Sequence, residues 1–523
     1  MKRQNTLSAL AVIAFGIVTG LTACKGDDPN VEPTPKVNIS LVSCSIAEDA
    51  EYAPSELTEV KVTYNDDVTV SPYANITLSG TRCKAASSAT TGTEVIITLP
   101  SLEGGKLYTL TIPKGAIISK KDNTVFAPDF SVTFATKEAL DPIDNDATAL
   151  AKRLGWGWNL GNHFDTSTGQ DGSPFQWGYW DNAKPTQALY TNLKNAGVST
   201  VRICVTWGNY QKSAPWTIDA KFMAEVKQNV EWAEAAGLNV ILNMHHDEYW
   251  LKIKEAAAND QVNNAIKERI EKTWTQIAET FKDKGDFLFF ESFNEVQDGG
   301  WGWGDNLNDG GKQYNTLNEW NQLVVDAIRS TGGQNATRWI GVPAYASNAQ
   351  FALKESFELP TDAANRVMVS VHYYDPNTFT LTPENEDGKP EWGHTAAAGK
   401  YQEGSNEEHV VETFQKLRET FIANNIPVYV GEFGCVMHTS ERSNLFRSYY
   451  LEYVCRAAHL YGLPTIIWDN NVAGSGNEHH AYFNHSNGSY QNGQEPLVQT
   501  MIKAATSDDE SYTLRSVYNK APK

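Results

Sequence analysis

The sequence predicts an α/β fold: a (β/α)8 barrel over residues 147–523, preceded by a small all-β sandwich over residues 37–137. Two patterns support this assignment. After residue 147, apolar runs alternate eight times with amphipathic stretches of helical period, whereas short segments before residue 137 alternate apolar and polar residues. A chain of 523 residues is long enough for two domains, each with a stable core.

The predicted sandwich contains the segments TEVKVTYN, EVIITLP, LYTLTIP and FSVTFAT, which are separated by turn residues. Alternation of this kind is typical of antiparallel strands. The last part, YTLTIPKGAIISKKDNTVFAPDFSVTF, resembles bacterial Ig-like repeats found beside catalytic domains. Sugar-binding platforms usually use exposed tryptophan or tyrosine, and all 15 tryptophans follow residue 150. We therefore expect this Ig-like domain to act as a spacer.

Residues 138–146 form a predicted linker, and the strand candidates that follow are GWGWNLG, TVRICVTW, NVILNMH, FLFFESFNE, RWIGVPAY, VMVSVHYY, VYVGEFG and TIIWDN. Runs that are apolar almost throughout indicate strands covered on both faces, hence a parallel sheet. Eight such units fit a closed barrel with inserted loops. An open doubly wound sheet is the alternative. It usually carries a glycine-rich phosphate loop after its first strand, and NLGNHFD lacks that fingerprint.

The first residues have the pattern of a signal peptide. Lys2 and Arg3 precede an apolar run from Leu7 to Ala23, which is too short to cross a bilayer as a helix. The segment LTAC resembles the lipobox of bacterial lipoproteins, which implies a signal peptide over residues 1–23 and a lipidated Cys24. A plain secretory signal is the alternative.

The segment that follows is rich in proline and acidic residues, so residues 24–36 are predicted to be an extended tether. Its KGDDP resembles the acidic export tag of surface lipoproteins in Bacteroidetes. We expect a cell-surface lipoprotein of the outer membrane, held only by its lipid, with a periplasmic or secreted protein as the alternative.

Composition excludes several classes of function. A net charge of −20 disfavours nucleic acid, whose phosphates require a basic surface. The six cysteines contain no CxxC pair, so a structural zinc site is not expected. Cys44 and Cys83 could form a disulfide or remain two thiols, and the sequence leaves both open. We expect a monomer without a cofactor.

Polar side chains recur where the predicted barrel strands end, and these ends converge on one mouth of such a barrel, where active sites lie. The residues concerned are Asn159, Asn162, Arg202, Trp207, His245, His246, Asp247, Asn294, Glu295, His372, Tyr374, Glu432 and Trp468. A single glutamate at a strand end is usually a solvated rim residue. Two glutamates that converge with histidines, an arginine and aromatic residues indicate catalysis instead.

Two carboxyl groups facing one cleft indicate hydrolysis of a glycosidic bond, in which one must be protonated and the other ionised. Arg202 would keep a nearby carboxylate ionised, while burial would raise the pKa of the other. Asn294 could bind a sugar 2-hydroxyl, and Trp468 offers a flat face for a sugar ring. The segment HHDE lacks the histidine spacing of a helical HExxH site, so no metal is expected.

The motifs GWNLGN, VRICVTW, HHDEYW, FNE, VHYYDP, GEFG and IIWDN together resemble those of glycoside hydrolase family 5, and within it the endoglucanases of subfamily 4. The resemblance implies that Glu295 is the acid/base and Glu432 the nucleophile of a retaining enzyme, whose carboxyl groups lie about 5 Å apart. The remaining, substrate-binding site positions that it implies are Arg202, His245, Asn294, His372, Tyr374 and Trp468, and His246 and Asn159 match frequent substrate contacts of the family. One departure is Asn471, where relatives often have glycine.

We therefore predict a retaining endo-β-1,4-glucanase acting on cellulose-type polymers, mixed-linkage β-glucan and xyloglucan. Trp301 and Trp303 are expected on the aglycone side of its cleft. An endo-β-1,4-mannanase or xylanase of the same mechanism is one alternative. A non-catalytic surface glycan-binding protein and a structural surface lipoprotein are the others.

Overall fold

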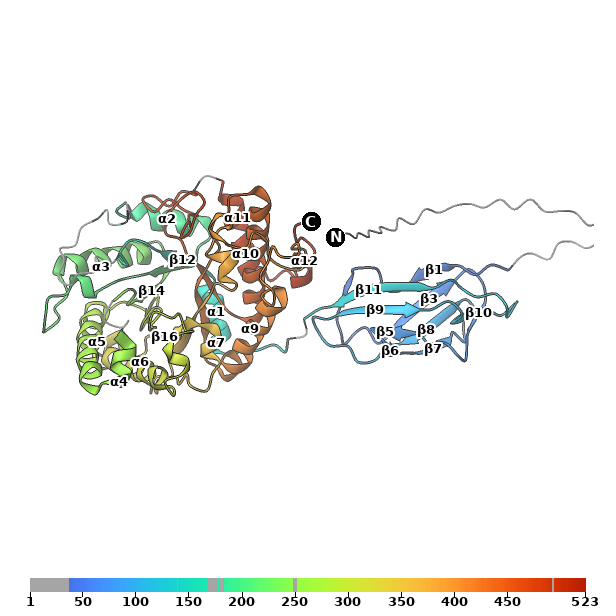
Figure 1. Cartoon of the computed structure of the whole chain (residues 1–523), viewed down its shortest axis with the longest axis horizontal. Coiled ribbons are helices and arrows are strands. Elements are labelled where there is room, and N and C mark those ends of the chain that lie inside the picture. Colours follow the sequence, from blue (N-terminus) through green and yellow to red (C-terminus); the bar gives the residue numbers. More distant parts are fainter. Residues whose placement is uncertain are drawn as a thin grey trace, which may run out of the picture. The chain divides into compact units, whose positions relative to one another are not determined.

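The computed structural model describes residues 37–138, 140–166, 177, 180, 183–247, 252–491 and 493–523. The chain forms two compact units that divide between residues 139 and 140. The first consists of β-strands, and the second is a barrel with surrounding helices (Figure 1). The predicted signal peptide, Cys24 and the tether lie outside the described residues.

The N-terminal unit is a small β domain with a single core. In one sheet the strand order is β1 (Leu41–Cys44), β3 (Glu59–Tyr64), β8 (Glu94–Thr98) and β7 (Lys84–Ser87). In a second sheet the order is β2 (Glu51–Tyr52), β11 (Phe130–Thr136), β9 (Leu107–Ile112), β5 (Thr77–Leu78) and β6 (Thr81–Arg82). A third sheet pairs β10 (Ile117–Ser119) with β4 (Val68–Val70). Val62 of β3, Ile97 of β8 and Phe134 of β11 are fully buried, because alternate residues of each strand face the shared core.

The two cysteines that the sequence left open are free thiols in this unit. Cys83 is buried, and burial raises the pKa of its thiol. The core is therefore held by apolar packing rather than by a disulfide between Cys44 and Cys83. The resemblance to Ig-like repeats and the spacer role both stay predictions.

The second unit is a closed eight-stranded parallel barrel, which confirms the predicted fold class. Its strands follow the chain in order: β12 (Trp156–Leu160), β13 (Thr200–Ile203), β14 (Asn239–Asn243), β15 (Leu288–Glu291), β16 (Ile340–Asn348), β17 (Val367–Tyr373), β18 (Val428–Phe433) and β19 (Thr465–Ile467). β19 pairs with β12 and closes the ring. Nearly every strand residue is buried, as expected for strands covered by helices outside and filled by side chains inside.

Helices surround the barrel, as Figure 1 shows for α2, α3, α5, α6 and α10. The helices are α1 (Asp146–Leu154), α2 (Gln187–Ala196), α3 (Ala220–Ala235), α4 (Ile253–Ala258), α5 (Asp260–Phe281), α6 (Lys312–Ser330), α7 (Ala349–Ala352), α8 (Asn377–Thr380), α9 (Glu407–Thr420), α10 (Glu441–Tyr461), α11 (Glu495–Thr506) and α12 (Leu514–Tyr518). No helix among the described residues is long and apolar enough to cross a membrane.

The end of the barrel at which the strands begin is filled by apolar side chains. Leu150 and Leu154 of α1 pack in one cluster with Ile241, Phe289 and other strand residues. A capping box at Asn145 starts α1, because the Asn145 side chain accepts from the backbone N–H of Thr148 while the Thr148 hydroxyl accepts from that of Asn145. This end of the barrel is therefore a packed core, and polar side chains occupy the opposite end.

Candidate active site

The polar interior of the barrel begins one layer above this apolar core, at Glu291. This carboxylate is completely buried at the end of β15 and accepts hydrogen bonds from Tyr429 Oη at 2.5 Å and Arg202 Nη2 at 2.6 Å. Burial would raise the pKa of Glu291, but Arg202 lowers it overall, so the carboxylate is ionised. Sequence reasoning missed this residue by taking FLFFES as apolar core.

Arg202 of β13 binds Glu291, and its guanidinium is completely buried. Besides Glu291 it donates from Nη1 to Glu432 Oε1 at 2.7 Å and from Nη2 to Asn294 Oδ1 at 2.8 Å. Burial would lower the pKa of Arg202, but the surrounding carboxylates hold it above its usual range. A planar fork with five donors is suited to this task, because it binds several acceptors in fixed directions.

Asn159 of β12 lies beside Arg202, with which it is in register on the neighbouring strand β13. Its Oδ1 accepts from Arg202 Nη1 at 2.9 Å, and its Nδ2 donates to the carbonyl of Gly431 at 3.0 Å. Asn159 and Arg202 are both fully buried and do not line the cleft. Through Arg202 they position Glu432 and Asn294, which do line it. That Asn159 contacts substrate stays a prediction.

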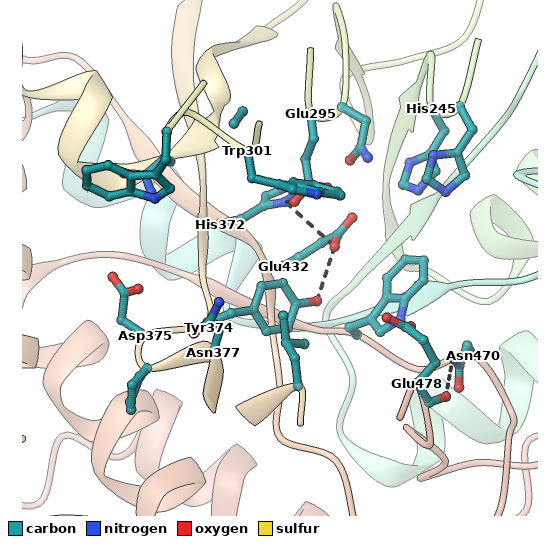
Figure 2. Close-up of a pocket in the computed structure, with 18 of the residues that line it drawn as sticks. His245, Glu295, Trp301, His372, Tyr374, Asp375, Asn377, Glu432, Asn470 and Glu478 are labelled. Atoms are coloured by element: carbon teal, nitrogen blue, oxygen red, sulfur yellow. Dashed lines mark hydrogen bonds and ion pairs between the residues drawn. The ribbon is translucent and has the colours of Figure 1, made fainter. Parts of the chain in front are cut away.

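Glu295 and Glu432 face each other across the mouth, with His372 between them (Figure 2). A carboxylate oxygen of Glu295 lies within 4.8 Å of one of Glu432. His372 Nδ1 lies 2.6 Å from Glu295 Oε1 and 3.6 Å from Glu432 Oε2. Tyr374 Oη donates to Glu432 Oε2 at 3.1 Å. Glu432, the candidate nucleophile, thus has three polar neighbours, which are Arg202, His372 and Tyr374. Glu295, the candidate acid, contacts His372.

The surroundings of the two glutamates separate their protonation. Burial raises the pKa of Glu295 to about 7, and burial lowers the pKa of His372 to about 4. The proton between them therefore resides on Glu295 at mildly acidic pH. Burial also raises the pKa of Glu432, but His372 and Arg202 oppose that rise. Glu432 accepts hydrogen bonds from Arg202 and Tyr374, which favour its ionised form, so the geometry supports Glu295 as the acid and Glu432 as the ionised partner.

His245 and Trp468 form one wall of the cleft, and their rings stack at 5.8 Å. Asn243 Oδ1 accepts from the backbone N–H of Val205, so its Nδ2 donates to His245 Nδ1 at 3.0 Å. His245 therefore carries its proton on Nε2 and is a donor. Gly161 lies behind Trp468, where an added Cβ would be 2.8 Å from the indole. We expect the glycone half of a substrate to lie along this wall and call it the glycone side.

The opposite wall carries aromatic and polar residues from the segments after β15 and β17, including Trp301, Trp303, Asp375 and Asn377. We expect the aglycone half of a substrate to lie here and call it the aglycone side. Trp301 and Trp303 are 58% and 68% exposed and line the cleft, which has a volume of about 770 Å³. His246 and Asn294 line it as well, whereas Trp207 is fully buried and donates from Nε1 to the Asn243 carbonyl at 2.9 Å.

Asn471, which departs from the family pattern, has a backbone φ of 63°. Glycine adopts this left-handed conformation freely, and asparagine is among the few other residues that tolerate it. The Asn471 side chain also accepts from Gln491 Nε2 at 2.9 Å. The substitution is therefore accommodated without a change of backbone region.

Two groups of ligand-type side chains in the described residues are close enough to hold a metal ion: Asp165 with His245 and His246, and Glu295 with His372 and Glu432. In the first, His245 presents a protonated Nε2, and Asp165 already accepts from the backbone N–H groups of Asn162 and His163. In the second, Arg202 occupies an oxygen of Glu432 and opposes a further cation. Both groups therefore fit hydrogen bonding better than metal binding.

Residues 161–474 match the family model described as Cellulase (glycosyl hydrolase family 5). The chain belongs to glycoside hydrolase family 5. The matched segment contains Arg202, Glu295, Glu432 and Trp468, whereas Asn159 lies two residues before it.

Relatives and solved structures agree with this assignment. Endoglucanase A of Paenibacillus barcinonensis is 33% identical over 64% of this chain and 85% of its own length. A xyloglucan-specific endo-beta-1,4-glucanase of Bacteroides ovatus is 31% identical over 76% of this chain and 80% of its own. The structure of a GH5-4 broad specificity endoglucanase from Bacteroides salanitronis has 44% identity and a TM-score of 0.65, covering 71% of this chain and 99% of that one.

The burial of Glu291 beside Arg202 leads to a prediction about stability. Replacing Glu291 with alanine should lower the free energy of unfolding by about 3–5 kcal/mol, because it leaves Arg202 buried without its main counter-ion. Chemical denaturation of the two proteins measures this loss. Asp286→Ala is the matched control, since it removes the exposed partner of Arg153 at 3.1 Å. Equal losses in both variants would contradict the account of Arg202.

Proposed function

We propose that this family 5 enzyme is a retaining endo-β-1,4-glucanase of β-glucans, with Glu432 as nucleophile and Glu295 as acid/base. The observation that carries the mechanism is the separation of the two carboxylates, which is within 4.8 Å between oxygen atoms. Retaining enzymes have carboxyl groups about 5–5.5 Å apart, whereas inverting enzymes leave about 6.5–9.5 Å for a water molecule. The named endoglucanases and the xyloglucanase support the choice of substrate class.

In the first step, the Glu432 carboxylate attacks the anomeric carbon of the sugar on the glycone side, and Glu295 gives its proton to the leaving oxygen. A glycosyl-enzyme forms, and the remainder of the chain departs over the aglycone side. Glu295, now ionised, takes a proton from water, which attacks the same carbon and releases Glu432. Two inversions leave the product with the β configuration.

The cleft also supports cleavage within a chain. Its lining extends to both sides of the glutamate pair, with His245 and Glu478 on one side and Asp375 and Asn377 on the other (Figure 2). Trp468, Trp301 and Trp303 supply apolar faces for sugar rings at positions along the cleft. A polymer can therefore be held by sugars on either side of the bond that is cut.

Release of reducing ends from barley β-glucan, xyloglucan, glucomannan and xylan tests this function. We expect β-glucan and xyloglucan to be cleaved at least about tenfold faster than xylan, with a rapid fall in viscosity that marks internal cuts. If the rate were highest on a mannan-containing polymer or on xylan, the enzyme would be a mannanase or a xylanase instead. Binding to these polymers without any release of reducing ends would mean that the protein is a non-catalytic glycan-binding protein.

The pH dependence of the reaction follows from Glu295. The acid must be protonated, and its pKa is about 7, so kcat/KM on a polysaccharide should fall as the pH rises through about 7. Activity should also fall at low pH, where Glu432 becomes protonated. In Glu295→Gln, the basic limb should disappear when an activated aryl glycoside is the substrate. A basic limb that persists at the same pH would show that another group is the acid.

We propose that Cys24 is lipidated and that the enzyme acts at the cell surface of a bacterium, held by its N-terminus. The motif LTAC and the short apolar run before it support this proposal. Wild-type protein expressed in a bacterium should partition with the membrane fraction, and Cys24→Ser should move it to the soluble fraction. Unchanged partitioning of the variant would refute the lipid anchor.

A further inference from the structure

The charged side chains that line the described part of the cleft are all carboxylates: Glu295, Asp375, Glu432 and Glu478. Three of them have partners. Glu295 and Glu432 belong to the catalytic pair, and Asp375 Oδ2 lies 3.5 Å from His409 Nε2. Arg202, the cation nearest to the pair, is buried beneath it and bound by carboxylates. The surface that a polysaccharide meets is therefore acidic.

Glu478 differs from the other three, because its carboxylate has no hydrogen bond or ion pair with any described residue. It is exposed and lines the cleft on the glycone side, next to Asn470 and across the cleft from Asp375 and Asn377 (Figure 2). An ionised carboxylate accepts hydrogen bonds only, and such charge-assisted bonds are stronger than neutral ones. Sugar hydroxyl groups are the donors that a glycan would bring to this position.

The backbone holds Glu478 in a conformation that it would not adopt freely. Its φ is 59°, in the left-handed region that disfavours a long side chain. Asn470 fixes this conformation: its Nδ2 donates to the Glu478 carbonyl at 2.6 Å, while its Oδ1 accepts from the His480 N–H at 3.2 Å. Strained residues that their surroundings hold in place occur often at binding sites.

We propose that Glu478 is a specificity-determining residue that accepts hydrogen bonds from hydroxyl groups of an uncharged sugar on the glycone side and repels acidic substituents there. The inference rests on the proposed function and narrows its substrates to neutral β-glucans. An acidic substituent on such a hydroxyl removes the donor and places a second negative charge beside the carboxylate. Both effects oppose binding.

Hydroxyethyl cellulose and carboxymethyl cellulose of equal degree of substitution test the proposal, since they differ in the charge of the substituent. Glu478→Gln should raise kcat/KM on carboxymethyl cellulose about fivefold at low ionic strength and lower it on hydroxyethyl cellulose about threefold, because an amide oxygen accepts a weaker hydrogen bond than a carboxylate. Added salt should reduce this gain, because it screens the repulsion. Glu478→Ala should raise KM on hydroxyethyl cellulose about tenfold with little change in kcat, as expected for loss of a charge-assisted hydrogen bond.

Two further variants isolate the role of Glu478. Asn477→Ala, an exposed neighbour outside the cleft lining, should behave as wild type on both polymers. Asp375→Asn removes one negative charge from the aglycone side. A gain on carboxymethyl cellulose equal to that of Glu478→Gln would show that only total charge matters and would overturn the proposal. If the ratio of kcat/KM on carboxymethyl cellulose to kcat/KM on hydroxyethyl cellulose were the same in wild type and in Glu478→Gln, the proposal would also be overturned.

Binding separates this proposal from the proposed function. Retardation in gels that contain either polymer can be compared for Glu432→Gln and for the double variant Glu432→Gln/Glu478→Gln, neither of which needs to turn over. The double variant should bind carboxymethyl cellulose more tightly at low salt. Failure of wild type to cleave any β-glucan would reject the proposed function, whereas equal binding by the two variants would reject the role of Glu478 alone.

Discussion

Glu432→Gln is expected to abolish turnover on every substrate, with a loss in kcat of about 10⁶-fold, the scale seen when the nucleophile of a hydrolase is removed. Glutamine keeps the shape of the side chain but cannot form the glycosyl-enzyme, and no other carboxylate of the described cleft occupies the position between Arg202 and Tyr374. Reducing-end release from β-glucan and release of an aryl aglycone from an activated glycoside both measure the loss.

The control for Glu432→Gln is retention of the fold and of substrate binding. Thermal unfolding and retardation by β-glucan in a gel should stay close to wild type, because the side chain is replaced by one of equal size. Residual turnover within about tenfold of wild type on either substrate would contradict the assignment of Glu432 as nucleophile.

Glu295→Gln is expected to have a second large effect, which depends on the leaving group. General acid–base catalysis contributes about 10²–10⁴-fold, so hydrolysis of a polysaccharide should fall by that factor. An activated aryl glycoside needs little protonation, so its first step should survive while the second step loses its base. The glycosyl-enzyme should then accumulate as a burst of released aglycone.

Azide tests the same variant, because it attacks the glycosyl-enzyme without a base. Added azide should restore steady-state turnover of the aryl glycoside by Glu295→Gln and yield a β-glycosyl azide. It should have no such effect on Glu432→Gln, which forms no intermediate. An equal response of the two variants to azide would mean that their roles are not distinct.

The barrel and most of its catalytic mouth were predictable because both follow from repetition along the chain. Eight buried runs, each followed by polar residues, indicate a barrel in which Glu295, His372 and Glu432 converge. Strand ends were less predictable. The run FLFFESFNE continues to Glu295, but β15 ends at Glu291, and Asn294 and Glu295 line the mouth from the segment after the strand.

The depth of polar residues within the barrel was not predicted. Asn159 and Arg202 lie one layer below the cleft, and a strand pattern does not show at which layer of a filled barrel a side chain lies. Glu291 did have a signal. A glutamate inside a run of phenylalanine and leucine indicates a buried carboxylate, which requires a buried cation such as Arg202.

Glu478 could not be predicted, because its position depends on a backbone conformation after β19 that Asn470 fixes through two hydrogen bonds. Whether Cys44 and Cys83 form a disulfide could not be predicted either, since spacing in the chain does not determine whether two cysteines of a β domain lie close together. Residues 1–36 lie outside the described residues, so the lipid anchor rests on the sequence motif.

The stereochemistry of the first product is the most direct test of the double displacement by Glu432 and Glu295. Proton NMR during the first minutes of β-glucan hydrolysis distinguishes the two anomers before mutarotation mixes them. The separation of the carboxylates predicts that the β-anomer forms first and that the α-anomer appears only at the rate of mutarotation. An initial α-anomer would mean a single inversion, and both assigned roles would then be wrong.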